Sequence, residues 1–470
     1  MTLARPQQPP RRATGVAVIG AALVALVGLG LLLLSDTALP FDRDTRARLY
    51  VASACVAGAL WLGAVALVRR GGLPQRTVWI VLAVAAAMRA MTFIAPPLLS
   101  SDVYRYVWDG RVQHAGINPY RYIPAAPQLE FLRDATIFPL VNRADYAPTI
   151  YPPAAEAIFA LAGLAAPGLG GMKAIMAGFD ALVIVALLWL LPLAGRDCAE
   201  TLIYGWLPLP VWEFAGNGHV DAAASGLLAL ALLASARGRS ALTGVALAAA
   251  TLTKFLPGAV LPAFWRPGDW RLGLVFALTL VVFYLPYLSV GWHVFGFLGG
   301  YVSEEGVRNG HGLFPLELLG RVVDLPAWAP PVYAVLALLL LAVLALRFVL
   351  SGPLPAEPGP RLLLQARQAV VLGAVLLVAL SPHYEWYFGW LAPLAGLAPL
   401  PAVLWLLAAA PLLALGPIEH LLIPVAVYVP AAALALWELR HLPASPLRAP
   451  PLSAPGSPAH RPSHTARSVR

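Results

Sequence analysis

Acidic and basic side chains crowd the stretch SSDVYRYVWDGR, residues 100–111, which directly follows an apolar run. If this stretch forms a helix, Asp102, Arg105, Tyr106 and Asp109 share one face. Asp102 comes almost first after the apolar run, so it can face the edge of a bilayer. A carboxylate partly removed from water at that depth has the character of a general base. The alternative is a lipid-surface helix whose aspartates and arginines pair with one another.

The opposite face of the same expected helix is apolar. It carries Val103, Tyr104, Val107 and Trp108, and Arg111 can extend its charged end toward the headgroups. Trp and Tyr are typical of helices that lie at headgroup level. The pattern therefore predicts an interfacial helix in the first long external loop.

A second group of ionisable residues lies in the segment GNGHVD. Its His219 and Asp221 fall between two apolar runs, where ionisable side chains that face a cavity are functional candidates. The plainer interpretation is a helix start capped by Asn217. A metal site made with His383 and Glu385 is a further alternative, although no spacing matches a strong ligand motif.

Lys254 interrupts another apolar stretch, TLTKFLP. Burying a lone ammonium group is costly, so the lysine needs a partner. One candidate partner is the phosphate of a lipid carrier. The alternatives are a backbone carbonyl or a neighbouring carboxylate.

The segment SPHYEWYFGW places His383 and Glu385 at the end of a further apolar run. An aromatic belt at the membrane surface accounts for Trp386, Tyr387 and Trp390 without any function. The belt does not account for the histidine and the glutamate. We expect these two side chains to contact a polar headgroup or a sugar.

The segment FDRDTR, residues 41–46, contains an Asp-x-Asp spacing that can hold a metal with a nucleotide sugar. The flanking Arg43, Arg46 and Arg48 favour a solvated loop of mixed charge instead. The chain also has no Gly-rich phosphate loop and no soluble domain able to hold a nucleotide.

Composition indicates how these residues are held. The chain has 470 residues, of which 60% are hydrophobic and only 12% are charged. Apolar runs of about 20 residues, the length that spans a bilayer, recur along it. Cys55 and Cys198 lie far apart in or beside apolar runs, so no disulfide framework is expected. The net charge of +9 is spread over short loops and both tails, which does not suggest a nucleic-acid partner. The fold class is an all-α polytopic membrane protein.

Arginines predict the topology, because short loops rich in arginine stay in the cytoplasm. The N-terminal tail and the loop around Arg70 and Arg76 are then inside. The anchors near Arg196, Arg237 and Arg266 are inside as well. This arrangement leaves external loops at about 98–173 and 291–327. A cytoplasmic tail covers residues 1–13, one membrane domain covers residues 14–438, and a disordered cytoplasmic tail covers residues 439–470.

The arginine positions force two irregular segments. Residues 151–170 must lie in the interface or re-enter the membrane, and residues 240–265 must form a re-entrant hairpin broken near Lys254. The remaining apolar runs give about 12 spans: 14–34, 48–68, 77–97, 174–194, 201–216, 219–236, 272–290, 328–350, 368–382, 386–400, 402–417 and 420–438.

This topology places four polar clusters on one external face. They are residues 100–111, 216–221, the loop EEGVRNGHG at 304–312, and residues 381–387. Because the charge rule ignores their chemistry, their convergence suggests a single site. We expect substrates to contact Arg105, Tyr106, Arg111, Tyr151, His219, Asp221, Lys254, Arg308, His311, His383 and Glu385.

Taken together, these motifs resemble a known group of enzymes. The aspartate after an early span, SDVYRYVWDGR with GINPY, YPP, GNGHVD, TLTKFLP and SPHYEWYFGW resemble the multispanning glycosyltransferases of the GT-C superfamily. The resemblance is closest to bacterial polyprenol-phosphate-mannose-dependent mannosyltransferases and family 87 relatives. It extends over residues 77–438. The first loop and the Gly-His-x-Asp element are its most specific parts.

The resemblance implies a polyprenyl-phosphate-linked hexose donor, with mannose favoured, and a glycolipid or cell-envelope glycan acceptor. It implies inverting transfer at the periplasmic face of the bacterial inner membrane. The general base is then an aspartate of the first external loop, which is Asp102, with Asp109 second. Lys254, Arg105, Arg111 or Arg308 would offset charge on the leaving phosphate. Because the phosphate already activates the sugar, no metal or other cofactor is expected.

Two features depart from the pattern of these enzymes. Two spans precede the one that leads to Asp102, where many relatives have one, and the external loops are short. The rival function is a transporter or flippase of lipid-linked sugars, which should show charge pairs near the middle of the membrane and related halves. No internal repeat is evident, and the polar groups cluster at one face. A non-catalytic scaffold would leave Asp102, His219 and Asp221 without a purpose.

Overall fold

The computed structural model describes residues 11–35, 41–306, 310, 312–416 and 422–441. Every regular element within these ranges is a helix, as the composition predicts. The expected tails at 1–13 and 439–470 lie almost entirely outside the described residues, as do Arg308 and His311.

Among the described residues, eight helices are long and apolar enough to cross a bilayer. They include α1 (Arg11–Leu34), α2 (Arg43–Arg69), α3 (Thr77–Ile94), α6 (Leu169–Leu193), α15 (Ala329–Val349), α16 (Pro358–Leu380) and α19 (Leu422–His441). The eighth begins as α12 (Trp270–Tyr284) and continues to Glu304. A ninth span results if Pro208–Gly216 and α9 (Asp221–Ala236), which are bent by 116°, are counted as one. The chain is a multi-pass membrane protein.

The expected count of about 12 spans is not confirmed. Three of the expected spans do not form helices of bilayer length. Residues 201–216 become α7 (Leu202–Gly205), α8 (Pro208–Pro210) and η4 (Val211–Gly216), and residues 386–400 become η7 (Glu385–Leu391) and α17 (Ala392–Leu397). Residues 402–417 contribute to one shorter helix, Pro401–Leu415, made of α18 (Pro401–Ala409) and η8 (Ala410–Leu415). Prolines cause these breaks, because a proline removes one backbone donor and clashes with the preceding turn.

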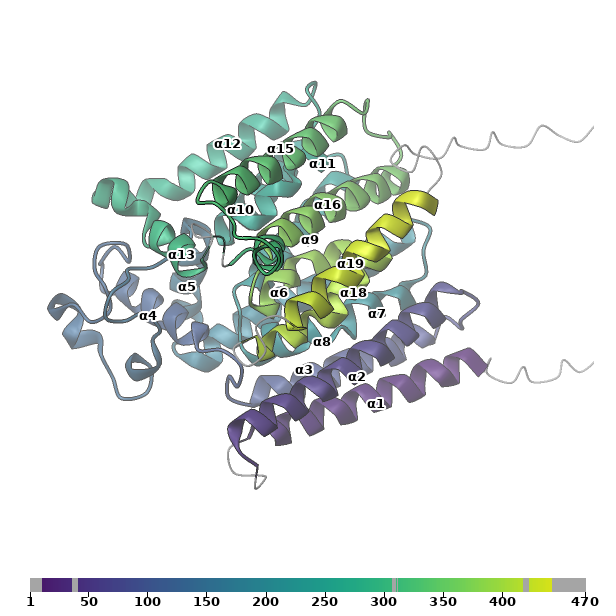
Figure 1. The fold of residues 1–470 in the computed structure, drawn as a ribbon, viewed down its shortest axis with the longest axis horizontal. Helices are drawn as coiled ribbons and strands as arrows, with labels where there is room; N and C mark the ends of the chain where they lie inside the picture. Colours follow the sequence, from purple (N-terminus) through teal and green to yellow (C-terminus); the bar gives the residue numbers. More distant parts are fainter. Residues whose placement is uncertain (1–10, 36–40, 307–309, 311, 417–421, 442–470) are drawn as a thin grey trace, which may run out of the picture.

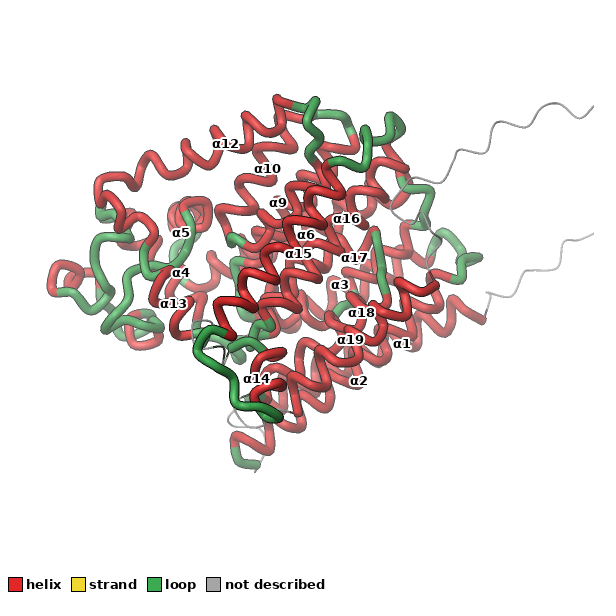
Figure 2. Tube along the Cα trace, turned by 45° about the horizontal axis from the view of Figure 1, so that its top comes forward, coloured by secondary structure: helices red, strands yellow, loops and turns green. Residues whose placement is uncertain are grey.

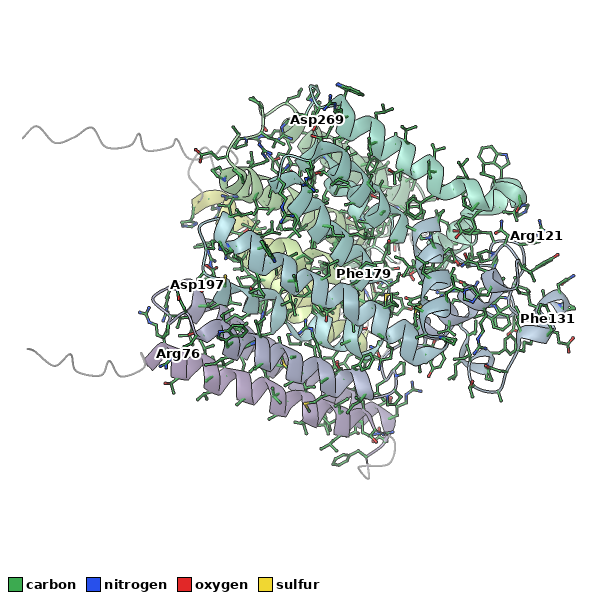
Figure 3. The ribbon with its side chains drawn as sticks, turned by 180° about the vertical axis from the view of Figure 1, so that it is seen from behind. Arg76, Arg121, Phe131, Phe179, Asp197 and Asp269 are labelled. Atoms are coloured by element: carbon green, nitrogen blue, oxygen red, sulfur yellow. The ribbon has the colours of Figure 1, made fainter. Side chains whose placement is uncertain are left out.

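The long helices lie side by side in one bundle, with α1 and α2 at one edge and α12 at the other (Figure 1). The described chain begins and ends at the same end of this bundle (Figure 1). Arg12 at the start of α1 donates to the carbonyl of Gly71 at 3.2 Å, so the first turn of α1 meets the loop after α2. Arg76 and Asp197 lie at this end, and Arg121 and Phe131 lie at the other (Figure 3). This separation matches the alternation predicted from the arginines. The side of the membrane stays a prediction.

Irregular chain gathers around α4 (Asp102–His114) and α5 (Pro153–Ala165) at one end of the bundle (Figure 2). The helix predicted within the stretch that begins at residue 100 is confirmed as α4, but the expectation that its apolar face meets lipid is wrong. Val103, Val107 and Trp108 are buried within the protein. Gly110 permits this packing, because a Cβ there would lie 2.6 Å from the carbonyl oxygen of Phe159 on α5.

The segment at 240–265 breaks where the sequence predicts. Helix α10 (Ser240–Thr253) ends immediately before Lys254, and η5 (Leu256–Val260) and α11 (Leu261–Phe264) follow. These arms and the 13-residue α5 are shorter than a bilayer span. Their re-entry into the membrane stays a prediction.

Candidate active site

The start of α4 is fixed by a side chain from a distant segment. Asn217 accepts hydrogen bonds from the backbone N–H groups of Leu98 (3.0 Å) and Leu99 (3.1 Å). Its amide nitrogen donates to Glu213 at 3.0 Å. The chain that leads into Asp102 is therefore tied to residues 211–220, more than a hundred positions later in the sequence. Asn217 does not cap α9 as the plainer interpretation expected, because α9 begins only at Asp221 and Val220 is its capping position.

Asp102 lies in the first turn of α4 with its carboxylate 20% exposed. Its Oδ1 accepts a hydrogen bond from Asn142 at 2.6 Å. Its Oδ2 lies 3.8 Å from Nδ1 of His219. Burial raises the pKa of Asp102 above its ordinary value of 3.8, while the charges of Lys254 and Arg143 oppose the rise. A carboxylate with a raised pKa and one oxygen free of hydrogen bonds has the properties of a general base.

His219 is held beneath Asp102. The side chain is 1% exposed, and its ring stacks on Trp386 with 4.4 Å between centroids. Nε2 lies 3.3 Å from Oε2 of Glu213. Glu213 belongs to the π-helical segment η4 (Val211–Gly216), a type of helix that often marks functional sites. Trp386 therefore supports the site and is not explained by an aromatic belt.

Gly218 brings this segment close to α4. Its φ of +71° is a conformation that residues with side chains rarely adopt. A Cβ at this position would lie 3.1 Å from the side chain of Val103 and 3.2 Å from that of Lys173. The Gly-His pair thus needs its glycine for the backbone turn and for the close packing beside Asp102.

Lys254 has the carboxylate partner that the sequence analysis considered. Its ammonium lies 2.8 Å from Asp221 and 4.1 Å from the ring centroid of Tyr387. The pair joins the end of α10 to the start of α9 and approaches Asp102 closely enough to influence its pKa. A paired lysine can still stabilise a developing negative charge at the same site.

Helix α13 (Leu298–Glu304) lies over these groups. Glu304 accepts a hydrogen bond from Arg143 at 2.8 Å, and Glu305 lies 3.6 Å from His383. Tyr301 and Tyr387 form a hydroxyl–hydroxyl contact. The neighbouring carboxylate of Glu305 raises the pKa of His383.

The structure therefore joins residues 98–102, 216–221 and 381–387, and the described part of the 304–312 loop contacts the third of these clusters.

Other predicted residues lie apart from this centre. Arg105 and Asp109 form a buried ion pair at 2.9 Å. Arg111 pairs with Asp134 at 2.6 Å, about 13.5 Å along α4 from Asp102. Burial raises the pKa of Asp109, and Arg105 opposes the rise. Asp109 is enclosed, so it is poorly placed to meet a substrate.

Two tyrosines that the sequence analysis assigned to the site lie near Asp102. Tyr106 stacks on Phe159 at 4.5 Å between centroids and meets the edge of Tyr151 at 5.0 Å. Tyr106 is buried and Tyr151 is partly buried. These rings shape the site from the side of α5.

A cavity of about 1260 Å³ adjoins the site. Trp386, whose ring covers His219, is one of its walls. The apolar lining includes Leu33, Leu34, Val51, Leu98, Leu99, Leu413 and Ile423, and the charged lining consists of Arg43, Arg46, Glu317, Arg321, His383 and Glu385. Burial raises the pKa of Glu385 to about 7. The segment FDRDTR thus contributes cavity-lining arginines, which its interpretation as a solvated loop did not predict.

The alternative of a metal held by His219, Asp221, His383 and Glu385 does not match the geometry. Within the described ranges, no group of three or more His, Cys, Asp or Glu side chains could hold a metal ion. His383 faces Glu305, and Asp221 faces Lys254.

The sequence analysis missed two polar residues of the site, and it considered Asn217 only as a helix cap. Glu213 lies in the expected span 201–216, and Asn142 lies in the first external loop. A lone glutamate inside an apolar run is a signal that would have identified Glu213. Asn142 carries no comparable signal, because only the folded loop brings it to Asp102.

The comparison with known families agrees with this geometry. Residues 12–266 match the MptA_B family, described as alpha-(1->6)-mannopyranosyltransferase, N-terminal domain. Comparisons with curated proteins and with solved structures found no significant match. The matched region contains Asp102, Glu213, His219 and Lys254. Because the match covers more than half of the 470 residues, the chain belongs to the MptA_B family of mannosyltransferases and is a glycosyltransferase.

Proposed function

We propose that the protein transfers a mannosyl group from a polyprenyl-phosphate donor to a hydroxyl of a glycolipid or cell-envelope glycan. One observation carries the proposal. Among the described residues, Oδ2 of Asp102 receives no hydrogen bond, and the site adjoins a cavity through Leu98 and Leu99, which precede Asp102, and through Trp386, which stacks on His219. This cavity combines apolar walls with arginines. The mannosyltransferase family supports the choice of sugar.

Asp102 acts as the general base in this proposal. Its carboxylate takes the proton of the acceptor hydroxyl while the acceptor oxygen attacks the anomeric carbon. The new carbon–oxygen bond forms as the bond between that carbon and the phosphate oxygen breaks. The leaving phosphate keeps the electron pair. Because attack and departure occur on opposite faces of the sugar, the configuration at the anomeric carbon inverts.

The cavity suits a lipid-linked donor. An isoprenoid chain is apolar and a phosphate is anionic, and the cavity offers partners for both. Arg43 and Arg46 lie in the first turn of the 27-residue helix α2, whose N-terminal dipole also favours an anion. Arg321 adds a further positive charge to the lining. These arginines replace Arg105 and Arg111 as candidates to contact the donor phosphate.

A basic side chain offsets the negative charge that develops on the leaving phosphate during the reaction. Lys254 lies close enough to Asp102 to stabilise negative charge that develops on the leaving group. The phosphate already makes the sugar reactive, so the proposed mechanism requires neither a metal nor another cofactor.

We place the reaction at the non-cytoplasmic face. Asp102 lies at the start of α4, in the loop region opposite to the end where Arg76 and Asp197 lie (Figure 3). Arginine-bearing short loops stay in the cytoplasm. A transporter of lipid-linked sugars is the less suitable function, because the family is one of transferases.

A deletion strain tests the proposal. We expect mass spectrometry of its envelope glycolipids and glycans to show the loss of one hexose at a defined position. Wild-type protein should restore that hexose, and so should His114→Asn, which changes an exposed residue at the far end of α4. Asp102→Asn should accumulate normally and should not restore it. An unchanged glycan profile in the deletion strain would exclude this activity in the envelope.

A further inference from the structure

Glu213 is connected to Asp102 by two routes. The first runs through Asn217, which accepts from the backbone N–H groups of residues 98 and 99 and donates to Oε2 of Glu213. The second runs through His219, whose Nε2 lies 3.3 Å from the same Glu213 oxygen. Nδ1 of His219 lies 3.8 Å from Oδ2 of Asp102. The first route ends at the segment just before α4, and the second ends at Asp102 in its first turn.

The imidazole of His219 is the unsatisfied member of this arrangement. Within the part of the chain that the structure describes, neither of its ring nitrogens has a hydrogen-bond partner in bonding geometry, although the ring is buried. Buried polar atoms are nearly always paired, so each exception requires an explanation. Stacking on Trp386 fixes the plane of the ring, and each nitrogen faces a carboxyl group.

We propose that His219 and Glu213 are positioning residues for the base. A neutral Glu213 carboxyl donates its proton to Nε2, which leaves the ring proton on Nδ1. The Nδ1–H group then points at Oδ2 of Asp102 across 3.8 Å, where it already favours the charged carboxylate, and the contact shortens to a full hydrogen bond when the substrates close the site. This inference rests on the proposed function of Asp102 as the base.

The protonation of each ring nitrogen of His219 follows from the carboxyl group that it faces. The hydrogen bond at one ring nitrogen decides which nitrogen carries the proton. The opposite tautomer would direct the lone pair of Nδ1 at the carboxylate of Asp102, which has no proton to offer when it acts as a base. Separations longer than a hydrogen bond are common at catalytic contacts in the absence of substrate. The distance of 3.8 Å is therefore compatible with closure on binding.

The arrangement leaves Asp102 free to react. Oδ1 accepts from Asn142, and Nδ1–H would occupy one lone pair of Oδ2. The second lone pair of Oδ2 remains for the acceptor hydroxyl. A donor aimed at the carboxylate also favours its charged form, so loss of that donor raises the pKa of the base.

Other groups around Asp102 stay unchanged in the variants that test this idea. Lys254 and Arg143 contribute positive charge, and Asp221 contributes negative charge. The surrounding tyrosines are Tyr106, Tyr151, Tyr384 and Tyr387.

The test is the pH dependence of dicyclohexylcarbodiimide labelling of Asp102, followed by mass spectrometry of the full-length protein in detergent. This apolar reagent reacts with the protonated carboxyl, so labelling falls as pH rises through the pKa of Asp102. In the variant H219N, the amide nitrogen takes the place of Nδ1 and still donates toward Asp102. In H219Q, the amide nitrogen takes the place of Nε2, so the donor toward Asp102 is lost. We expect H219Q to raise the midpoint by about one pH unit and H219N to raise it by less than half as much. The control variant His114→Asn should match the wild type.

Glu213 provides a second, independent pair of variants. A glutamine can donate to Nε2 as the neutral carboxyl does, whereas a leucine cannot. Both variants lose the oxygen that accepts from the amide nitrogen of Asn217, so only the difference between them reports the donor to Nε2. We expect E213L to raise the midpoint by about one pH unit and E213Q to raise it by less than half as much. Equal midpoints for H219N and H219Q, or for E213Q and E213L, would overturn the proposal. If one variant does not fold, the other pair decides.

Labelling requires no substrate, so the two proposals can fail separately. Shifted midpoints in a protein without transfer activity would retain the positioning role and reject the proposed function. Transfer activity with unshifted midpoints would retain the proposed function and reject the positioning role.

Discussion

Two aspartates anchor buried polar groups in this protein, and their surroundings differ. Asp180 on α6 accepts from Arg89 Nε at 2.6 Å and Nη2 at 3.1 Å, and from Tyr204 at 2.6 Å. Arg89 also donates to the carbonyl of Gly205 at 2.7 Å. Both carboxylate oxygens of Asp180 are therefore satisfied, and its side chain is 0% exposed. This group joins α3, α6 and α7 (Leu202–Gly205).

Asp102 presents the opposite case. Only one of its carboxylate oxygens has a hydrogen bond, and the nearby His219 is unsatisfied. Its side chain is 20% exposed. Leu98 and Leu99, which precede Asp102 in the chain, line the cavity. A carboxylate whose two oxygens are both hydrogen-bonded within the protein holds helices together. A carboxylate with one oxygen left without a hydrogen bond can still bind a substrate. The comparison predicts that variants at Asp180 lose stability and variants at Asp102 lose chemistry.

The largest expected effect on stability follows Asp180→Ala. Removal of one partner leaves Arg89 buried without its counter-charge, which costs about 3–5 kcal/mol. Thermal and denaturant unfolding of the purified protein would measure this loss. Glu317→Ala is the matched control, since its partner Arg321 is largely exposed, the two lie 4.0 Å apart, and the pair should contribute less than about 1 kcal/mol. Equal losses in the two variants would break the comparison.

The next effect concerns Lys254. Lys254→Met removes the cation next to Asp102 and leaves Asp221 unpaired, so we expect kcat/KM for transfer to fall about 100-fold. Lys173→Met is the control, because Lys173 donates to the carbonyl of Ala95 at 2.5 Å at the end of α3. That variant should lower stability more than it lowers transfer per folded molecule. The reverse ranking of the two lysines would assign the catalytic charge to Lys173.

A smaller effect concerns the cavity arginines. We expect Arg43→Gln combined with Arg321→Gln to raise KM for the lipid-linked donor about 10-fold with little change in kcat, since each removes a positive charge from the lining. Arg76→Gln, at the other end of the bundle, is the control (Figure 3). A change in kcat alone would place the arginines outside donor binding.

The smallest effect is a shift in pH dependence. Asp102 must be ionised to accept a proton, so kcat/KM should fall on acidification with a midpoint above 3.8. Arg143 stabilises the ionised form, so its loss raises the pKa of Asp102. We therefore expect Arg143→Gln to move the acidic limb upward by about half a pH unit. A downward shift would contradict the assignment of this limb to Asp102.

The same comparison shows how far the sequence predicts the fold. Apolar runs of bilayer length correctly indicate a helical membrane protein. Arg76 and Arg121, which the arginine pattern assigns to opposite sides of the membrane, lie at opposite ends of the bundle, and their sides stay a prediction (Figure 3). The count of about 12 spans is not confirmed, because a proline divides one apolar run into short helices, at Pro208. Apolar composition alone does not distinguish a span from such packed fragments, because both are buried away from water.

The site is predictable only in part. Helical periodicity places Asp102 and Tyr106 on one face, and a buried lysine requires a partner, which proves to be Asp221. Periodicity also places Arg105 and Asp109 on that face, but they pair with each other and are enclosed. Contacts between distant segments decide such outcomes, as with Asn142 at Asp102, and one sequence carries no information about them.

The central claim is that Asp102 serves chemistry and Asp180 serves stability. The most direct measurement compares Asp102→Asn with Asp180→Asn in purified protein, with mannosyl transfer and unfolding temperature recorded on the same samples. We expect Asp102→Asn to lose transfer by about 1000-fold, since an amide cannot accept the proton, with an unchanged unfolding temperature. Asp180→Asn should unfold at a lower temperature and keep transfer per folded molecule. Normal transfer by Asp102→Asn would contradict the account.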